Sequence, residues 1–192
     1  MSEILVPNQG ILFMKVGVHA KESLEDIIAR KTQEIEEAGF ALWGYGGSTC
    51  HPSTMVQPFA KEHAALGKPV VLCMQEMDSK HFADPVRAEE FSVDKVHWHP
   101  IHPSIHVLGS RYALAIKGLR HEEFDLPLDK THVALGKSLG RAGNKYIAGR
   151  VDKACLNLGD TINVPAGPDD PIVKINLVAE LCDPYAVFLR NT

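Results

Sequence analysis

Apolar residues occur in three nearly continuous runs within the first part of the chain. These runs cover residues 11–18, 40–45 and 70–74 (ILFMKVGV, FALWGY and VVLCM). A short apolar run without polar alternation is typical of a strand that is buried on both faces. We therefore predict three strands here, separated by two longer segments of mixed polarity.

The first mixed segment has the spacing and the end signals of a helix. Its apolar positions share one helical face: Leu24, Ile27, Ile28 and Ile35. Ser23 is followed three residues later by Asp26, which is a capping signal, and Gly39 stands where a helix commonly ends. The charged opposite face predicts a helix that covers one side of a sheet.

The second mixed segment also predicts a helix. Thr54 and Gln57 form a second cap signal, and Gly67 marks the expected end. Pro58 would then fall in the first turn, where its missing N–H costs little. The resulting order of strand, helix, strand, helix and strand predicts a mostly parallel sheet with right-handed crossovers.

The remainder of the chain is richer in strand patterns than in helix patterns. Residues 78–103 contain prolines and lack periodicity, which predicts a long excursion over the surface. Further strands are expected at residues 105–116, 131–135, 172–181 and 185–189, and a helix at residues 137–158. We thus predict a single compact α/β domain over residues 1–192, with a β-α-β-α-β N-terminal half and a strand-rich C-terminal half that makes the sheet mixed.

Composition narrows the class of protein. The chain has 192 residues, 45% hydrophobic and 23% charged, which is ordinary globular usage. A net charge of −4 argues against general nucleic-acid binding, which needs a basic surface. We see no signal-peptide pattern, no apolar run long enough for a bilayer and no paired cysteine motif. A soluble, cytoplasmic protein without membrane association is expected.

The glycine-rich turn at residues 44–54 is the main candidate for a ligand site. Its first residues are predicted to contact the ligand: Gly44, Tyr45, Gly46, Gly47, Ser48 and Thr49. Glycines permit left-handed backbone and close approach of a ligand, and the helix N-terminus that follows attracts anions such as phosphate. The turn matches neither G-x-G-x-x-G nor the P-loop pattern, so a tight strand-to-helix connection remains the alternative.

Reactive groups lie in or near this turn. Cys50 precedes the predicted helix N-terminus, a position that can lower a thiol pKa and make the sulfur nucleophilic, although a buried and inert cysteine is the commoner case. His51 and Glu76 are further candidates for catalysis. If chemistry follows binding, we expect hydrolysis or group transfer at a phosphate or glycosidic bond.

Basic side chains form a further candidate site. Lys137, Arg141 and Lys145 would line one face of the predicted helix at residues 137–158, and a solvated basic stripe is the default interpretation. Arg150 would project into the apolar face of that helix, where it needs a carboxylate or an anionic ligand. Arg111, in the apolar stretch GSRYALAI, poses the same question.

Histidines cluster in the segment VHWHPIHPSIH. Four of them fall within ten residues: His97, His99, His102 and His106. Three imidazoles around zinc with one open position would form a hydrolytic site. The spacing matches no established zinc signature, so surface histidines are the alternative.

Three functions therefore remain open. The first is binding of a phosphate-bearing small molecule such as a nucleotide, with Trp43 or Tyr45 stacking on a base. The second is a metal-dependent hydrolase that uses the segment at residues 97–106, with His97, His99 and His102 as ligands of a metal such as zinc. The third is a non-catalytic interaction module that uses the excursion and the basic residues. Formation of a homo-oligomer is expected under each, because Trp98 in a loop is unfavourable to expose.

Overall fold

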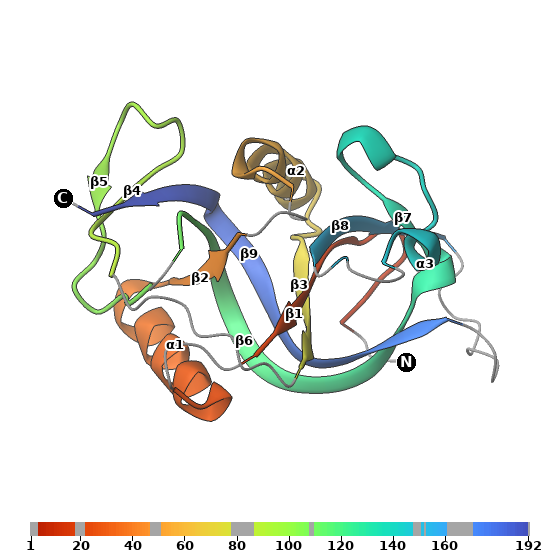
Figure 1. Cartoon of the computed structure of the whole chain (residues 1–192), viewed down its shortest axis with the longest axis horizontal. Coiled ribbons are helices and arrows are strands. Elements are labelled where there is room, and N and C mark those ends of the chain that lie inside the picture. Colours follow the sequence, from red (N-terminus) through yellow and green to blue (C-terminus); the bar gives the residue numbers. More distant parts are fainter. Residues whose placement is uncertain are drawn as a thin grey trace.

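Two long neighbouring strands organise the molecule, as the computed structural model in Figure 1 shows. Strands β6 (Tyr112–Pro127) and β9 (Ile172–Arg190) pair in antiparallel fashion along most of their length. The ladder contains three register shifts, which bend a pair of strands. Both strands follow a deep U-shaped curve in Figure 1. The structure describes residues 4–17, 22–46, 51–77, 87–107, 110–147, 151, 153–160 and 171–191.

The other described strands extend this pair into one mixed sheet of nine strands. The main path through the sheet runs β2-β6-β9-β3-β1-β8-β7, and β4 pairs with β9 and with β5. The bounds of these strands are β1 Gly10–Val16, β2 Ala41–Tyr45, β3 Val71–Glu76, β4 Glu90–Ser92, β5 His99–Pro100, β7 Thr131–Val133 and β8 Lys153–Leu158. The predicted mixed α/β sheet is confirmed.

The prediction of a mostly parallel N-terminal sheet is wrong in its finer part. The elements follow in the predicted order, but β1 and β3 form the one parallel pair among the described strands. Strand β2 lies at the far edge and pairs antiparallel with β6. An apolar run identifies a strand without identifying its neighbour, and β6 and β9 separate β2 from β1 and β3.

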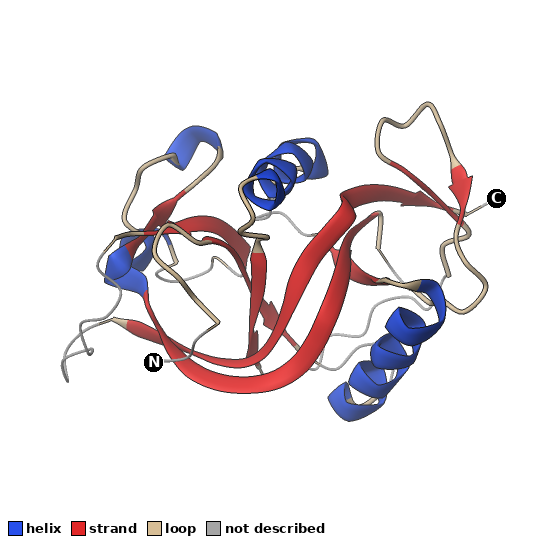
Figure 2. Ribbon diagram, turned by 180° about the vertical axis from the view of Figure 1, so that it is seen from behind, coloured by secondary structure: helices blue, strands red, loops and turns tan. Residues whose placement is uncertain are grey.

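The first helix forms as the sequence predicts. Helix α1 (Leu24–Ala38) begins at Ser23, whose hydroxyl accepts a hydrogen bond from the backbone N–H of Asp26 at 3.1 Å. Gly39 ends the helix with a φ of 86°, in the left-handed region that favours glycine. Figure 2 shows α1 beside the curved sheet, well separated from the second long helix, α2 (Ser53–Ala65).

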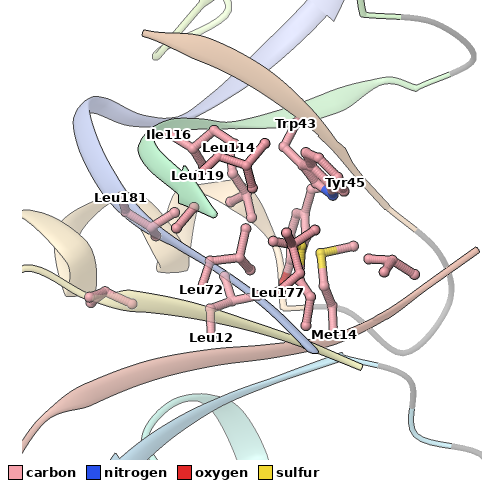
Figure 3. Packing of buried hydrophobic residues seen from close by; sticks show 14 of the residues in the cluster. Leu12, Met14, Trp43, Tyr45, Leu72, Leu114, Ile116, Leu119, Leu177 and Leu181 are labelled. Atoms are coloured by element: carbon pink, nitrogen blue, oxygen red, sulfur yellow. The ribbon is translucent and has the colours of Figure 1, made fainter. Parts of the chain in front are cut away.

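Side chains from both long helices meet strand residues in one core cluster. Figure 3 shows part of it, with Leu12 and Met14 from β1, Trp43 and Tyr45 from β2, and Leu177 from β9. The alternate residues of β1, Ile11 and Phe13, belong to a second cluster on the other face. Burial on both faces explains the continuous apolar run of residues 11–18.

The predicted helix at residues 137–158 is wrong. The described residues form a 3-10 turn η2 (Gly136–Ser138), a short helix α3 (Gly143–Tyr146) and then strand β8. Gly136 and Gly140 have φ values of 77° and 85°, which a helix interior does not accept. Lys137, Arg141 and Lys145 therefore do not lie along one helical face.

A buried ion pair on α1 forms hydrogen bonds with the backbone of the segment at residues 87–107. Lys31 and Glu34 are 4% and 1% exposed, and the Lys31 Nζ atom lies 2.9 Å from Glu34 Oε2. The Lys31 ammonium also donates to the carbonyl of His106, whose backbone N–H donates to Glu34 Oε1 at 2.9 Å. Burial lowers the pKa of Lys31 to about 8, against the opposing charge of Glu34. These contacts satisfy both buried charges of the pair.

Candidate functional site

The start of α2 lacks the cap that the sequence predicts. The helix begins at Ser53, its N-cap residue is Pro52, and no side-chain hydrogen bond closes this end. Thr54 is already inside the helix, so its assignment as the cap is wrong, and Pro58 lies beyond the first turn. The first turn also contains no acidic residue. Uncapped N–H groups together with the helix dipole make such an end attractive to an anion.

Two buried polar side chains at this helix end each have an atom without a hydrogen-bond partner in the part of the chain that the structure describes. Ser53 is 3% exposed and His51 is 8% exposed, and the Ser53 Oγ and His51 Nε2 atoms are both unpaired. A buried polar group without a partner costs about 1–3 kcal/mol. Burial lowers the pKa of His51 below its ordinary value of 6.5, so the imidazole is neutral at pH 7. A hydroxyl and a neutral imidazole can both donate to an anion.

A distant part of the chain forms one wall of this site. Gly136 has a φ of 77°, and a Cβ atom placed on it would lie 3.3 Å from the His51 Nδ1 and Cε1 atoms. The ring of Tyr146 lies nearly parallel to that of His51, with 6.4 Å between their centroids. Both ends of the segment at residues 136–147 thus contact His51. Sequence reasoning missed Gly136 and Tyr146, because no local pattern signals a contact between residues so far apart in the chain.

Strand β2 forms another part of the site. The hydroxyl of Tyr45 donates to the carbonyl of His51 at 3.1 Å, which holds the backbone just before α2. Gly44 and Gly46 do not adopt the left-handed backbone. Instead they lie against Ser110, where a Cβ atom on Gly44 would be 3.4 Å from the Ser110 Cβ. These distances are ordinary van der Waals contacts, so neither turn geometry nor close packing in the described residues explains the two glycines.

Several residues predicted to contact a ligand are instead buried in the hydrophobic core, and another is exposed beside the site. The side chains of Trp43 and Tyr45 are 7% and 1% exposed and point into the core cluster (Figure 3), so they offer no open face for stacking. Arg111 is exposed next to Ser110 and has no ion pair among the described residues. Four predicted residues and one candidate nucleophile lie outside the described residues: Gly47, Ser48, Thr49, Arg150 and Cys50.

The structure does not bring Glu76 to this site. Glu76 ends β3 and is exposed, and its backbone N–H donates to the Asn176 side chain. Following the antiparallel pairings from β3 through β9 and β6, β2 runs opposite to β3. The carboxyl ends of β2 and β3 therefore face opposite edges of the sheet, as Figure 1 shows.

The described thiols are unsuited to nucleophilic chemistry. Cys73 and Cys182 are free thiols, and Cys73 and Cys155 are buried. Burial raises the pKa of Cys73 well above its usual range and that of Cys182 to about 11. Thiols held in the neutral form react slowly, because the thiolate is the nucleophile.

The predicted metal histidines have separate partners. His97 Nδ1 lies 2.7 Å from Asp94 Oδ2, His102 Nδ1 lies 2.7 Å from Ser104 Oγ, and the His99 ring packs against Phe91. Within the described ranges, no group of three or more histidine, cysteine, aspartate or glutamate side chains gathers as a metal site would require. Trp98 is half-buried beneath Arg190, whose guanidinium carbon lies 4.1 Å from the ring centroid.

A shallow depression of about 560 Å³ lies elsewhere, over β3, β6 and β9. Val71 and Val178 contribute apolar lining, and Arg120, Glu122 and Glu180 contribute charge. These charges are already paired, since Arg120 Nε lies 3.5 Å from Glu122 and Lys117 lies 3.9 Å from Glu180. The start of α2 is the stronger candidate, because its buried polar atoms have no partner.

No comparison with known proteins indicates a function, so a functional inference depends on the geometry of the site itself. None of the described helices is both long and apolar enough to cross a lipid bilayer. Comparison with protein-family models, with curated proteins and with solved structures finds no match to this chain.

Proposed function

We propose that the protein binds a phosphate-bearing small molecule, with nucleotides as the expected class, at the start of α2. The observation that carries this proposal is the pair of buried, unpaired polar atoms, Ser53 Oγ and His51 Nε2, at an uncapped helix N-terminus. An oxyanion would accept hydrogen bonds from both groups and from the free backbone N–H groups. Its binding would remove the cost of leaving these groups unsatisfied.

The charges around the site favour an anion over a cation. The first turn of α2 carries no carboxylate, and Arg111, beside the end of β2, has no ion pair within the described ranges. A neutral His51 adds a hydrogen-bond donor without a fixed positive charge. The site therefore suits an anion that is recognised by directed hydrogen bonds, as phosphate is.

Tyr146 supports the expectation of an aromatic group on the ligand. Its side chain is half-buried and its ring lies alongside His51, so a planar base attached to the phosphate has an aromatic neighbour here. Tyr146 thus takes the stacking role for which Trp43 and Tyr45 are too deeply buried. If turnover accompanies binding, His51 is the described titratable group placed to transfer a proton.

Calorimetric titration of adenosine monophosphate and adenosine tests the proposal. We expect the monophosphate to bind and adenosine to bind at least about tenfold more weakly, because charge-assisted hydrogen bonds contribute about 1.5–3 kcal/mol. The variant Ser53→Ala, alone and combined with His51→Phe, should weaken binding of the monophosphate. Ser53→Ala removes a hydroxyl that has no partner, so its fold should be preserved.

A matched control is available at residues 102–104. His102 and Ser104 have the same two-residue spacing but already bond to each other at 2.7 Å on the surface. The double change His102→Phe and Ser104→Ala should leave phosphate affinity unchanged. Failure of the wild-type protein to bind any phosphate compound, or full binding by both Ser53 variants, would refute the proposed function.

A further inference from the structure

Basic residues are concentrated in the segment that forms a wall of the α2 site. Residues 130–151 contain five lysines and arginines and no aspartate or glutamate, in a chain whose net charge is −4. Lys137, Arg141 and Lys145 are exposed, and no ion pair holds any of them within the described residues. These three exposed side chains therefore present positive charge that no described carboxylate compensates.

Two of these lysines adjoin the residues that contact His51. Lys137 follows Gly136, whose backbone lies against the His51 ring, and Lys145 precedes Tyr146, whose ring lies parallel to it. Neighbouring Cα atoms are about 3.8 Å apart, so both lysine side chains start within a few ångströms of the site wall. Figures 1 and 2 show this segment rising beside α2 on the same side of the sheet.

Hydrogen bonds hold the backbone of this segment in place. The backbone N–H of Gly140 donates to Val133 at 2.8 Å, and that of Val133 donates to the carbonyl of Arg141 at 2.8 Å. The N–H of Lys145 donates to Ala142 at 3.1 Å. Gly143 packs so closely on Thr131 that an added Cβ atom would lie 1.9 Å from its Oγ1 atom. The lysine side chains thus extend from a fixed backbone, which lowers the entropic cost of placing them on a ligand.

We propose that the ligand carries at least two linked phosphoryl groups, as a nucleoside diphosphate does, with the second group lying along Lys137 and Lys145. This inference rests on the proposed phosphate site at the start of α2. The first phosphoryl group takes the hydrogen bonds of Ser53, His51 and the helix end. A single phosphoryl group there leaves both lysines without a counterion, whereas a diphosphate engages them.

Titration of adenosine monophosphate, adenosine diphosphate and pyrophosphate against three proteins tests this inference. The wild-type protein should bind the diphosphate about tenfold more tightly than the monophosphate, the ratio expected for one additional charge-assisted contact. Lys137→Ala with Lys145→Ala should reduce that ratio to about threefold or less while binding of the monophosphate stays nearly unchanged. Both lysines are exposed, so an unchanged melting temperature should accompany the loss.

The control is Lys117→Ala with Lys174→Ala, which removes the same charge from exposed positions on β6 and β9. It should retain the preference for the diphosphate. Equal affinity for the two nucleotides in the wild-type protein, or a preference that survives in the Lys137 and Lys145 variant, would overturn the inference and leave the phosphate site standing. Absence of all binding in the wild-type protein would overturn the phosphate site itself.

Discussion

The two long helices of this protein begin in opposite ways. Helix α1 has a serine cap that bonds to the N–H of Asp26, and Glu25 and Asp26 supply negative charge in its first turn. Helix α2 starts after a proline, has no acidic residue in its first turn and buries the hydroxyl of Ser53 without a partner. The N-terminus of α1 is therefore capped by a side chain, whereas that of α2 is not.

The regions around the two helices also differ in how their buried polar side chains are paired. Around α1 the buried charges of Lys31 and Glu34 bond to each other and to the backbone of His106. Around α2 the Ser53 Oγ and His51 Nε2 atoms are buried at comparable depth and have no hydrogen-bond partner among the described residues. An unpaired buried donor lowers stability, so we infer that binding compensates for it.

The largest expected effect concerns the α1 side of the comparison. Replacing Glu34 by alanine should lower the free energy of unfolding by about 3–5 kcal/mol, because Lys31 would remain buried without its carboxylate. Chemical denaturation of the variant and the wild-type protein measures this loss. The matched control is Glu36→Ala on the exposed face of the same helix, with an expected change below about 0.5 kcal/mol. Equal losses of unfolding free energy at both positions would mean that the buried ion pair contributes no more to stability than an exposed glutamate does.

A second prediction compares the two serines directly. Ser23→Ala should cost about 1 kcal/mol, the usual loss for a removed helix cap. Ser53→Ala should leave stability unchanged or raise it by up to about 1 kcal/mol, because its hydroxyl is buried without a partner. Urea denaturation of both variants in ligand-free buffer gives the two values. A loss at Ser53 as large as that at Ser23 would show that the Ser53 hydroxyl already has a structural role.

The same contrast shows how far the sequence predicts the structure. The cap at Ser23 and the stop at Gly39 are local signals, and the α1 prediction is confirmed within one residue. The Thr54–Gln57 pattern places the cap of α2 two residues too late, because the N-cap is Pro52 and the helix begins at Ser53. Local pattern thus locates helices well, but it does not show whether a helix end is satisfied.

Contacts between distant residues account for the remaining errors. The position of β2 beside β6, and the contacts of Gly136 and Tyr146 with His51, depend on the curvature of the whole sheet. The apolar spacing at residues 137–158 predicts a helix that its glycines weaken, yet tertiary pairing with β1 makes residues 153–158 a strand. The sequence predicts the helix end and His51 as parts of a site, and the structure adds Gly136 and Tyr146 as neighbours of His51.

A third prediction concerns the acidic first turn, which α1 has and α2 lacks. Thr54 occupies the second position of α2, as Glu25 does in α1, and it is exposed. Thr54→Asp should raise stability by about 0.3–1 kcal/mol through the helix dipole and should abolish the thermal shift caused by phosphate, since the carboxylate repels it. Thr54→Asn, which has the same shape without the charge, is the control and should keep the phosphate response. Retained phosphate binding in the aspartate variant would place the anion elsewhere.

The smallest expected effect is a pH dependence at His51. Because burial lowers its pKa in the folded protein, the unfolded chain binds more protons as pH falls below 6.5. The stability contributed by the neutral His51 is therefore present above pH 6.5 and is lost on acidification. Denaturation of wild-type protein and His51→Gln from pH 7.5 to pH 5 should show a steeper decline for wild type, since the other histidines are common to both. Sulfate keeps a constant charge over this pH range and, at saturation, should stabilise the imidazolium. It should therefore reduce the difference in pH dependence between wild type and His51→Gln. An identical difference with and without sulfate would place His51 outside the anion site.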